Sequence, residues 1–376
     1  MNIAFVRLYR GIDDTGEFYN LQEVGLAKAL CEKQDAKEGT QVHILILTSQ
    51  KEGYTREIVK DKIWLHSVPA KGIGHHGILD TGWFEKLHID AVHLQSDNML
   101  FAPKVIKYCL KHHIPCHNYI GTIYSDNSSA WKRKMISVIF ARNLHWYRKI
   151  PTFAKTPTVQ KQLVDAGVPH TILAPVALDV TVIPEIQKSK ADLRAELGLA
   201  EDKTWLVFVG RLEEYKHPMD ALNLIQRLPE NYNLLMIGKG SLDHQIKREI
   251  REKELENKVR QIMQVKNTEI HRWIKACDFF VNFNPNEIYG MAILEAMYQG
   301  SVVCAIHAPG PDFLLEDNQT GILCDDISEM EKRILLTDAD RCRELGKKAQ
   351  NEVECKYQWN ATADIILKEV SWGREK

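Results

Sequence analysis

Residues 284–306 read NPNEIYGMAILEAMYQGSVVCAI, and the fold prediction starts from this stretch. It follows the apolar run DFFVNF at 278–283 and opens with a turn that contains Pro, Asn and Gly. A helix is expected to begin near Gly290, and the apolar run SVVCAI at 301–306 reads as the next strand. A strand, a turn, a helix and a second strand in this order are typical of a parallel sheet covered by helices.

Similar apolar runs repeat along the whole chain. The alternation restarts after a polar, charged segment around 181–203, and the stretch near 20–33 has the apolar spacing of a helix that packs on a sheet. The expected strands are 2–8, 42–48, 63–68, 91–95, 115–120 and 151–155 in the first half, and 205–210, 233–238, 259–263, 278–283 and 301–306 in the second.

The expected fold class is therefore α/β, with two Rossmann-like domains that face each other across a cleft. At 376 residues the chain exceeds what one hydrophobic core usually supports. We expect a first domain at 1–180, a hinge near 177–190 and a second domain at 181–357. Residues 358–376 are predicted to form a helix that packs back on the first domain. Ligands of such sheets bind at the carboxyl ends of the strands, so the cleft is the expected binding site.

Composition excludes several classes of protein. The chain is 44% apolar and 26% charged with a net charge of −1, and it has neither a signal-peptide pattern nor an apolar run long enough to span a membrane. A soluble, cytoplasmic protein that binds no nucleic acid is expected. The cysteines form no CxxC pair, and the histidine pairs at 75–76 and 112–113 lack ligand spacing. Asp338 and Asp340 superficially fit a DxD metal motif but read as a helix cap, so neither a metal nor a cofactor is expected.

Glu287 and Glu295 are the first candidate site residues. On one helix they would lie about 12 Å apart, which exceeds the roughly 5–9.5 Å between the carboxyl groups of glycosidases. They therefore read as two hydroxyl-binding groups, although the spacing alone would also fit a solvated helix face. Gly290 permits a close backbone approach, and backbone N–H groups at the helix start can face a diphosphate.

The segment FVGRLEEYKHPMDAL (208–222) places two cations directly after an apolar strand. Taken alone, Arg211 and Lys216 would fit ordinary surface positions. Their place ahead of Glu287 in the same domain favours side chains that point into the cleft.

These two segments resemble the retaining family-4 glycosyltransferases of the GT-B fold, the glycosyl transferases group 1. Residues 287–300 match the string E-x-[FY]-G-x-x-x-x-E-A-M-x-x-G. The upstream segment is similar to the family pattern G-R-L followed by Lys and often Gly, with His217 in place of that glycine. The resemblance spans nearly all of the second domain and is architectural across the first.

The resemblance implies a site for a nucleotide sugar, with UDP as the expected nucleotide. Glu287 would contact the transferred sugar and Glu295 the ribose, while Arg211 and Lys216 would neutralise the leaving diphosphate in place of a metal ion. The acceptor hydroxyl would attack from the leaving-group face with retention of configuration, without a protein nucleophile. The catalytic candidates are Arg211, Lys216 and Glu287, and the donor-binding candidates are Gly16, Gly210, Met263, Tyr289, Gly290, Met291, Leu294 and Glu295.

The first domain is expected to bind the acceptor. In RGIDDTGEFYN (10–20), Gly16 can supply a tight turn near the donor phosphates. Many relatives place a histidine where Gly121 aligns, whereas the nearest histidine here, His117, is expected to be structural and inside a strand. The acceptor-side candidates are Asp13, Asn20, Tyr119, Gly121 and Thr122.

The tract at 129–149 mixes six cations with apolar residues, as surface-seeking amphipathic helices do. It predicts contact with an anionic membrane surface, at the inner face of the membrane, or with an anionic acceptor. A solvated helix that packs on the sheet is the competing interpretation.

The predicted activity is transfer of a sugar to a hydroxyl of a glycan, glycolipid or polyprenyl-linked acceptor in polysaccharide or cell-envelope biosynthesis. Two alternatives stay open: a nucleotide-sugar epimerase of the same architecture, and a noncatalytic glycosyltransferase-like partner subunit. Turnover of the nucleotide sugar without an acceptor would distinguish the first, and loss of the cations and glutamates would have favoured the second.

Overall fold

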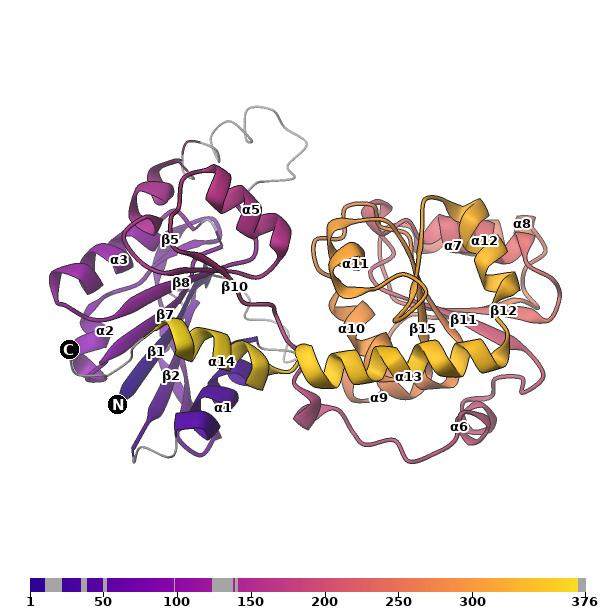
Figure 1. Ribbon diagram of the computed structural model, residues 1–376, viewed down its shortest axis with the longest axis horizontal. Helices are drawn as coiled ribbons and strands as arrows, with labels where there is room; N and C mark the ends of the chain where they lie inside the picture. Colours follow the sequence, from indigo (N-terminus) through magenta and orange to yellow (C-terminus); the bar gives the residue numbers. More distant parts are fainter. Residues whose placement is uncertain are drawn as a thin grey trace. The chain divides into compact units, whose positions relative to one another are not determined.

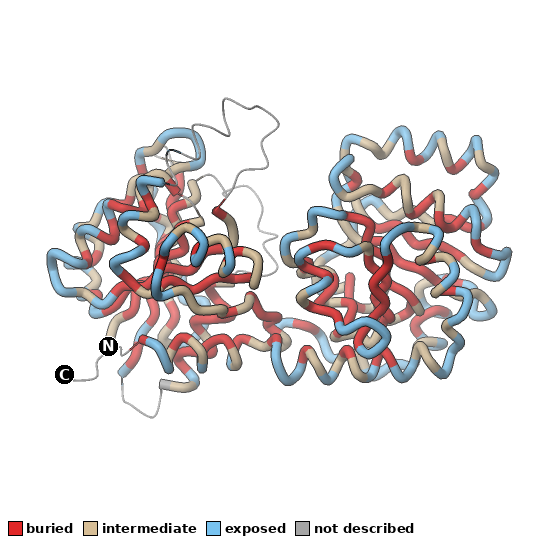
Figure 2. Tube along the Cα trace, turned by 45° about the horizontal axis from the view of Figure 1, so that its top comes forward, coloured by how far each residue is buried: buried red, intermediate tan, exposed pale blue. Residues whose placement is uncertain are grey.

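The chain folds into two compact units. The computed structural model describes residues 1–10, 22–34, 39–49, 53–97, 99–123, 138 and 141–370. Unit 1 contains Met1–Ala177 and Trp359–Lys376, and unit 2 contains Leu178–Gln358. Each unit is built around a mainly parallel sheet (Figure 1), and most of the central strands are buried while many helical positions are exposed (Figure 2).

The sheet of unit 1 has the strand order β10-β9-β8-β7-β1-β2-β4-β3, and β3 alone on this path runs antiparallel to its neighbour. The hairpin of β5 and β6 pairs with β1 through β6, and α1 packs against α14. The strands are β1 (Asn2–Arg10), β2 (Gln41–Thr48), β3 (Thr55–Lys60), β4 (Ile63–Pro69), β5 (Lys71–Ile73), β6 (His76–Ile78), β7 (Ala91–Gln95), β8 (Cys116–Ile120), β9 (Thr152–Ala154) and β10 (Thr171–Leu173). The helices are α1 (Gln22–Gln34), α2 (Gly82–Lys86), α3 (Ala102–Lys111), α5 (Pro157–Asp165) and α14 (Trp359–Glu369).

The sheet of unit 2 is parallel throughout and has the order β13-β12-β11-β14-β15-β16. Its strands are β11 (Thr204–Val209), β12 (Tyr232–Ile237), β13 (Val259–Ile262), β14 (Phe279–Asn282), β15 (Val302–Ile306) and β16 (Ile322–Cys324). Its helices are α6 (Lys190–Leu197), α7 (Pro218–Arg227), α8 (Asp243–Glu252), α9 (Asn267–Ala276), α10 (Met291–Tyr298), α11 (Pro309–Leu314), α12 (Ile327–Leu336) and α13 (Ala339–Lys356), with short 3₁₀ turns at Val180–Val182 and Glu214–Lys216.

The predicted strands all occur, with ends that differ by one or two residues. Sequence reasoning missed β3, β5, β6, β10 and β16. Four of these have only three residues, and every residue of β3 is exposed, so it lacks the alternation of buried and exposed positions that identifies a strand. The cap prediction is confirmed, because the Asp338 side chain accepts a hydrogen bond of 2.8 Å from the Arg341 amide at the start of α13.

The described residues contain no helix that is both long and apolar enough to cross a membrane. Most of the cysteines are buried, as expected, but Cys355 is exposed on α13.

Helix α13 lies unusually close to the loop between α10 and β15. A Cβ atom on Gly346 would lie 2.2 Å from the backbone oxygen of Gly300, closer than any real side chain can sit. The glycine at 346 is therefore required for this contact, even though glycine weakens a helix.

We predict that Gly346→Ala destabilises unit 2. The forced separation of α13 from the loop should cost about 2–3 kcal/mol, of which the better helix propensity of alanine returns only about 1 kcal/mol. Thermal unfolding followed by circular dichroism measures the difference. Gly53→Ala is the control, since nothing lies within 4 Å of a Cβ atom there; an unchanged or raised midpoint for Gly346→Ala would contradict the prediction.

Candidate functional site

The candidate site of unit 2 lies where its strand order changes direction. The chain moves outward from β11 to β12 and β13, then returns to the other side of β11 to form β14, β15 and β16. The loops that follow β11 and β14 therefore leave neighbouring strands toward opposite sides. In open α/β sheets this point forms a crevice at the carboxyl ends of the strands, where ligands bind.

Lys216 and Glu287 meet at this point. The Lys216 ammonium donates a hydrogen bond of 2.5 Å to Glu287 Oε2, which also accepts a bond of 3.3 Å from the Asn284 side-chain amide. Both charged side chains are partly buried, with exposed fractions of 24% for Lys216 and 13% for Glu287. The ion pair thus links the loop after β11 to the loop after β14.

Arg211 lies on the same loop as Lys216, and Tyr215 stands close to both. The ring centre of Tyr215 is 5.5 Å from the Arg211 guanidinium carbon and 5.5 Å from the Lys216 ammonium. Tyr215 was not among the predicted residues, although an aromatic residue between two cations was a visible signal. His217 follows with φ of 52°, a left-handed conformation that glycine adopts easily, which explains the glycine common at this position in the family pattern.

The turn from Glu287 to Gly290 leads into α10. Gly290 has φ of 96° and directly precedes the helix, as expected from the sequence. The turn is held from the other side by Gly310, whose amide donates a hydrogen bond of 2.7 Å to the Glu287 carbonyl. A Cβ atom on Gly310 would lie 2.4 Å from the Tyr289 carbonyl oxygen, so only glycine permits this contact.

Glu295 lies on the second turn of α10. Among the described residues none donates a hydrogen bond to its carboxylate. Loss of hydration raises the pKa of the Glu295 carboxyl to about 7. Glu295 is only partly buried by its exposed surface, and a partly dehydrated carboxyl group with no donor among the described residues favours a role in ligand binding over a structural one.

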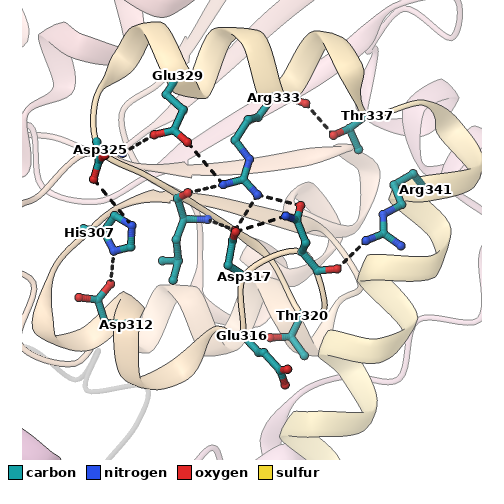
Figure 3. A network of polar contacts seen from close by, with 12 residues as sticks. His307, Asp312, Glu316, Asp317, Thr320, Asp325, Glu329, Arg333, Thr337 and Arg341 are labelled. Atoms are coloured by element: carbon teal, nitrogen blue, oxygen red, sulfur yellow. Dashed lines mark hydrogen bonds and ion pairs between the residues drawn. The ribbon is translucent and has the colours of Figure 1, made fainter.

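A polar network near α11 supports the turn (Figure 3). His307 follows β15, and its Nδ1 lies 2.7 Å from Asp312 on α11 while its Nε2 lies 4.0 Å from Asp325. On α12, Arg333 donates bonds of 2.6 Å to Asp317 and 2.5 Å to the Leu323 carbonyl. These contacts tie α11, which carries Gly310, to the ends of β15 and β16.

The loop GKGS at 238–241 contacts the loop that carries Arg211 and Lys216, and it was not among the residues predicted from the sequence. A Cβ atom on Gly238 would lie 1.8 Å from the Gly210 carbonyl oxygen, so the loops after β11 and β12 are in contact. The Glu213 carboxylate accepts bonds of 2.9 and 2.5 Å from the Ser241 amide and hydroxyl. Two glycines directly after an apolar strand were the available signal.

The remaining donor-side candidates differ in their positions. Gly210 lies at the end of β11, and Met291 is the first residue of α10. Met263 follows β13 and is 53% exposed, but β12 separates its strand from β11. Leu294 is fully buried, so any donor contact it makes would have to come through its backbone. In the described part of the chain no group of three or more His, Cys, Asp and Glu side chains is placed to hold a metal ion.

In unit 1 only some of the acceptor-side candidates can be placed. Gly16, Asp13 and Asn20 lie outside the described residues. Gly121 and Thr122 directly follow β8, and the Gly121 amide donates a bond of 2.6 Å to Asp97 Oδ1. Tyr119 is fully buried within β8, so its ring is part of the interior and not of the acceptor surface.

His117 lies inside β8 as predicted. It is fully buried, and its Nε2 lies 2.7 Å from Nδ1 of His93 on the neighbouring strand. Burial lowers the pKa of His117 to about 3, so the ring is neutral at physiological pH. This environment agrees with the structural role expected for it.

The basic tract at 129–149 is described only at 138 and from 141 onward. Residues 141–147 are helical, and Leu144 and Trp146 pack against the apolar core of unit 1. Tyr147 is fully buried and donates a bond of 3.0 Å to the Ser96 hydroxyl. In this part of the tract the apolar side chains of Leu144, Trp146 and Tyr147 contact the core of unit 1, as expected for a helix that packs on the sheet; most of the remaining tract lies outside the described residues.

Comparison with known proteins yields matches in both sequence and fold. Residues 189–352 match the family model described as Glycosyl transferases group 1. A D-inositol 3-phosphate glycosyltransferase of Arthrobacter sp. (strain FB24) is 28% identical over 232 residues, which cover 57% of this chain and 53% of that protein. The chain thus spans about half the length of the curated relatives it matches.

Two solved structures match nearly the whole chain in fold. Sucrose-phosphate synthase from Thermosynechococcus elongatus superposes with a TM-score of 0.73 at 16% identity, covering 98% of both chains. A structure of Anabaena Alr3699/HepE in complex with UDP-glucose gives a TM-score of 0.69 at 17% identity, covering 98% of this chain and 100% of that one. At such identities the likeness establishes the fold, and it confirms the predicted α/β class with two Rossmann-like domains. The chain therefore has the GT-B fold of these structures, and residues 189–352 of its second unit match the glycosyl transferases group 1 family model.

Proposed function

We propose that the protein is a retaining glycosyltransferase that moves a sugar from a UDP-sugar to a hydroxyl of a glycan, glycolipid or polyprenyl-linked acceptor in polysaccharide or cell-envelope biosynthesis. The contact between Lys216 and Glu287 at the turning point of the sheet is the observation that carries this proposal. In this contact a cation that could bind a diphosphate lies beside a carboxylate that could bind sugar hydroxyls. The Anabaena Alr3699/HepE structure with UDP-glucose supports the choice of nucleotide.

In this proposal the cations stabilise the leaving group. Arg211 and Lys216 extend from one loop and share contact with Tyr215, so both can reach the same diphosphate. As the bond between the sugar carbon and the phosphate oxygen breaks, negative charge develops on the diphosphate, and fixed cations lower the energy of that state. Before the sugar nucleotide binds, Glu287 provides a partner for Lys216, which reduces the cost of holding a partly buried charge.

The acceptor oxygen would form its bond to the sugar on the face from which the diphosphate departs. Its proton would pass to the departing phosphate oxygen, so no protein nucleophile is needed and the configuration is retained. Glu287 would orient the sugar through its hydroxyls, and Glu295 would accept hydrogen bonds from the ribose. The Glu295 carboxylate is suited to this role because it has no donor among the described residues.

We predict that Lys216→Ala and Glu287→Ala each lower sugar transfer by a factor of about 100 or more, because each removes a group that acts on the reacting bond. A screen of nucleotide sugars by calorimetry first identifies the donor, and transfer is then measured with each variant. Lys253→Ala is the matched control, since Lys253 forms a similarly buried ion pair with Glu249 in the same unit. Undiminished transfer in both site variants would disprove the assignment.

The two alternatives predict different outcomes in the same preparation. NMR of the nucleotide sugar alone would show conversion to an epimer if the protein were an epimerase. A noncatalytic partner subunit would bind at most the nucleotide sugar and would not transfer it to any acceptor tested. The presence of Arg211, Lys216, Glu287 and Glu295 together in unit 2 favours the transferase.

Stability should depend on pH through Glu295. Its carboxyl pKa is about 7 in the folded protein against an ordinary value of 4.5, so folding favours the protonated form. Its contribution is therefore fully favourable below about pH 4.5 and is lost as the pH rises through 7.

We predict that Glu295→Gln raises the free energy of unfolding at about pH 8 by roughly 1–3 kcal/mol but changes it little near pH 5, where the wild-type carboxyl is already neutral. Urea unfolding at the two pH values measures the effect. UDP affinity supplies a second readout: it should fall with decreasing pH in the wild type and depend less on pH in the variant. An equal change in stability at both pH values would contradict the prediction.

A further inference from the structure

Three neighbouring strands of unit 1 end in one row of residues. In the register of the sheet, Gln95 on β7 lies opposite Tyr119 on β8, which lies opposite Phe153 on β9. Two residues further, the same spacing places Asp97, Gly121 and Lys155 side by side just beyond the carboxyl ends of these strands. The Lys155 amide donates a bond of 2.9 Å to the Ile120 carbonyl, so the parallel pattern continues to this row.

An ion pair crosses the glycine in the middle of the row. The Lys155 ammonium lies 3.2 Å from Asp97 Oδ2, while Oδ1 of the same carboxylate accepts the 2.6 Å bond from the Gly121 amide. The strands that carry the two charges are not adjacent, and their backbones lie roughly 9–10 Å apart. A Cβ atom on Gly121 would lie 2.8 Å from Lys155 Cδ and 3.3 Å from Asp97 Oδ1, so the glycine leaves the path open.

Asp97 adopts an unfavourable backbone conformation in this arrangement. Its φ is 30°, in the region that residues other than glycine rarely occupy. Such conformations cost on the order of 1–3 kcal/mol and are concentrated at binding and catalytic sites. The strain indicates that the position of the carboxylate matters more than the stability of the loop.

The pair keeps unused hydrogen-bonding capacity. An ammonium group has three N–H donors, and among the described residues only Asp97 accepts one from Lys155, whose Nζ also lies 4.9 Å from the Tyr119 ring centre. The Lys155 side chain is only 9% exposed, whereas that of Asp97 is 32% exposed. The opposite charges cancel, so the pair presents donors and acceptors without a net charge. A hydroxyl group, which both donates and accepts, matches this better than an anion.

We infer that Asp97 and Lys155 bind the hydroxyl groups of a polyol or sugar acceptor. One acceptor hydroxyl donates to the Asp97 carboxylate, and it or its neighbour accepts from the Lys155 ammonium. This inference rests on the proposed transferase function and specifies the chemical class of its acceptor. The two residues are binding residues, and Gly121 is a positioning residue because it permits their contact.

The test uses the full chain and three kinds of variant. Lys155→Met and Asp97→Asn each remove one charge, whereas Gly121→Ala keeps both charges and separates them. Lys161→Met is the matched control, because Lys161 forms an exposed ion pair with Asp165 in the same unit. Saturation-transfer NMR measures binding of glycerol, myo-inositol and methyl glucosides, and calorimetry measures binding of UDP. Where UDP-glucose is turned over, KM for the polyol and kcat are also determined.

Binding of at least one polyol to the wild type is expected, and KM or the dissociation constant for it should rise about tenfold or more in the three variants, as loss of a hydrogen bond to a charged group predicts. UDP affinity should stay within about twofold, since unit 2 carries the nucleotide site. If the ion pair were merely structural, its loss would lower the unfolding midpoint. Polyol binding would then not weaken selectively relative to UDP binding. The control should change neither.

Several outcomes would overturn the inference. The wild type could bind no polyol, the folded variants could bind polyols as the wild type does, or inorganic phosphate could displace the polyol, which would indicate an anion site. The wild-type measurements suffice for this decision even if a variant fails to fold. Polyol binding without any UDP binding would disprove the proposed transferase function and leave the hydroxyl site standing, so the two failures are distinguishable.

Discussion

The hydrogen-bonded ion pair of Lys216 and Glu287 is the contact on which the site of unit 2 depends. It joins the loops that leave β11 and β14, the two strands between which the order of the sheet turns back. In open α/β sheets ligands bind at such a turning point, and the ion pair determines where the two charges lie there. Because each charge already has a partner, the loops can hold their positions before a ligand arrives.

Glycines around this pair allow backbones to approach more closely than side chains would permit. Gly238 lies against the Gly210 carbonyl, and Gly310 lies against the Tyr289 carbonyl and binds that of Glu287. The first contact fixes the position of the loop that carries the two cations. The second fixes the position of the turn that carries Glu287. Both contacts are made by backbone atoms, so we attribute their value to positioning.

In unit 1, too, a glycine allows a close approach, in this case between two charged side chains. Gly121 leaves space for Lys155 to reach Asp97 across one strand, and the strained backbone of Asp97 contributes to the geometry. In both units an ion pair links the ends of strands at the carboxyl edge of a sheet. Glu295 differs, because its carboxyl has no such partner among the described residues, and loss of hydration raises its pKa to about 7.

The sequence by itself determined the fold class, the order of the main strands, and the segments that contain Arg211, Lys216, Glu287 and Glu295. Apolar periodicity and turn residues are local signals, and the glycosyltransferase motif concentrates its residues in short stretches. The short strands and the exposed strand β3 were not predicted, because their sequences carry little periodic signal. The GKGS loop and Tyr215 were visible as patterns, but their relevance depends on which loops become neighbours.

Only the tertiary structure decided which distant residues meet. Lys216 and Glu287 are 71 positions apart, and Asp97 and Lys155 are 58 apart. Contacts over such separations follow from strand order and register, which no local pattern contains. The structure likewise decided that Tyr119 and Leu294 are buried, because burial depends on what packs against each element and not on the element alone.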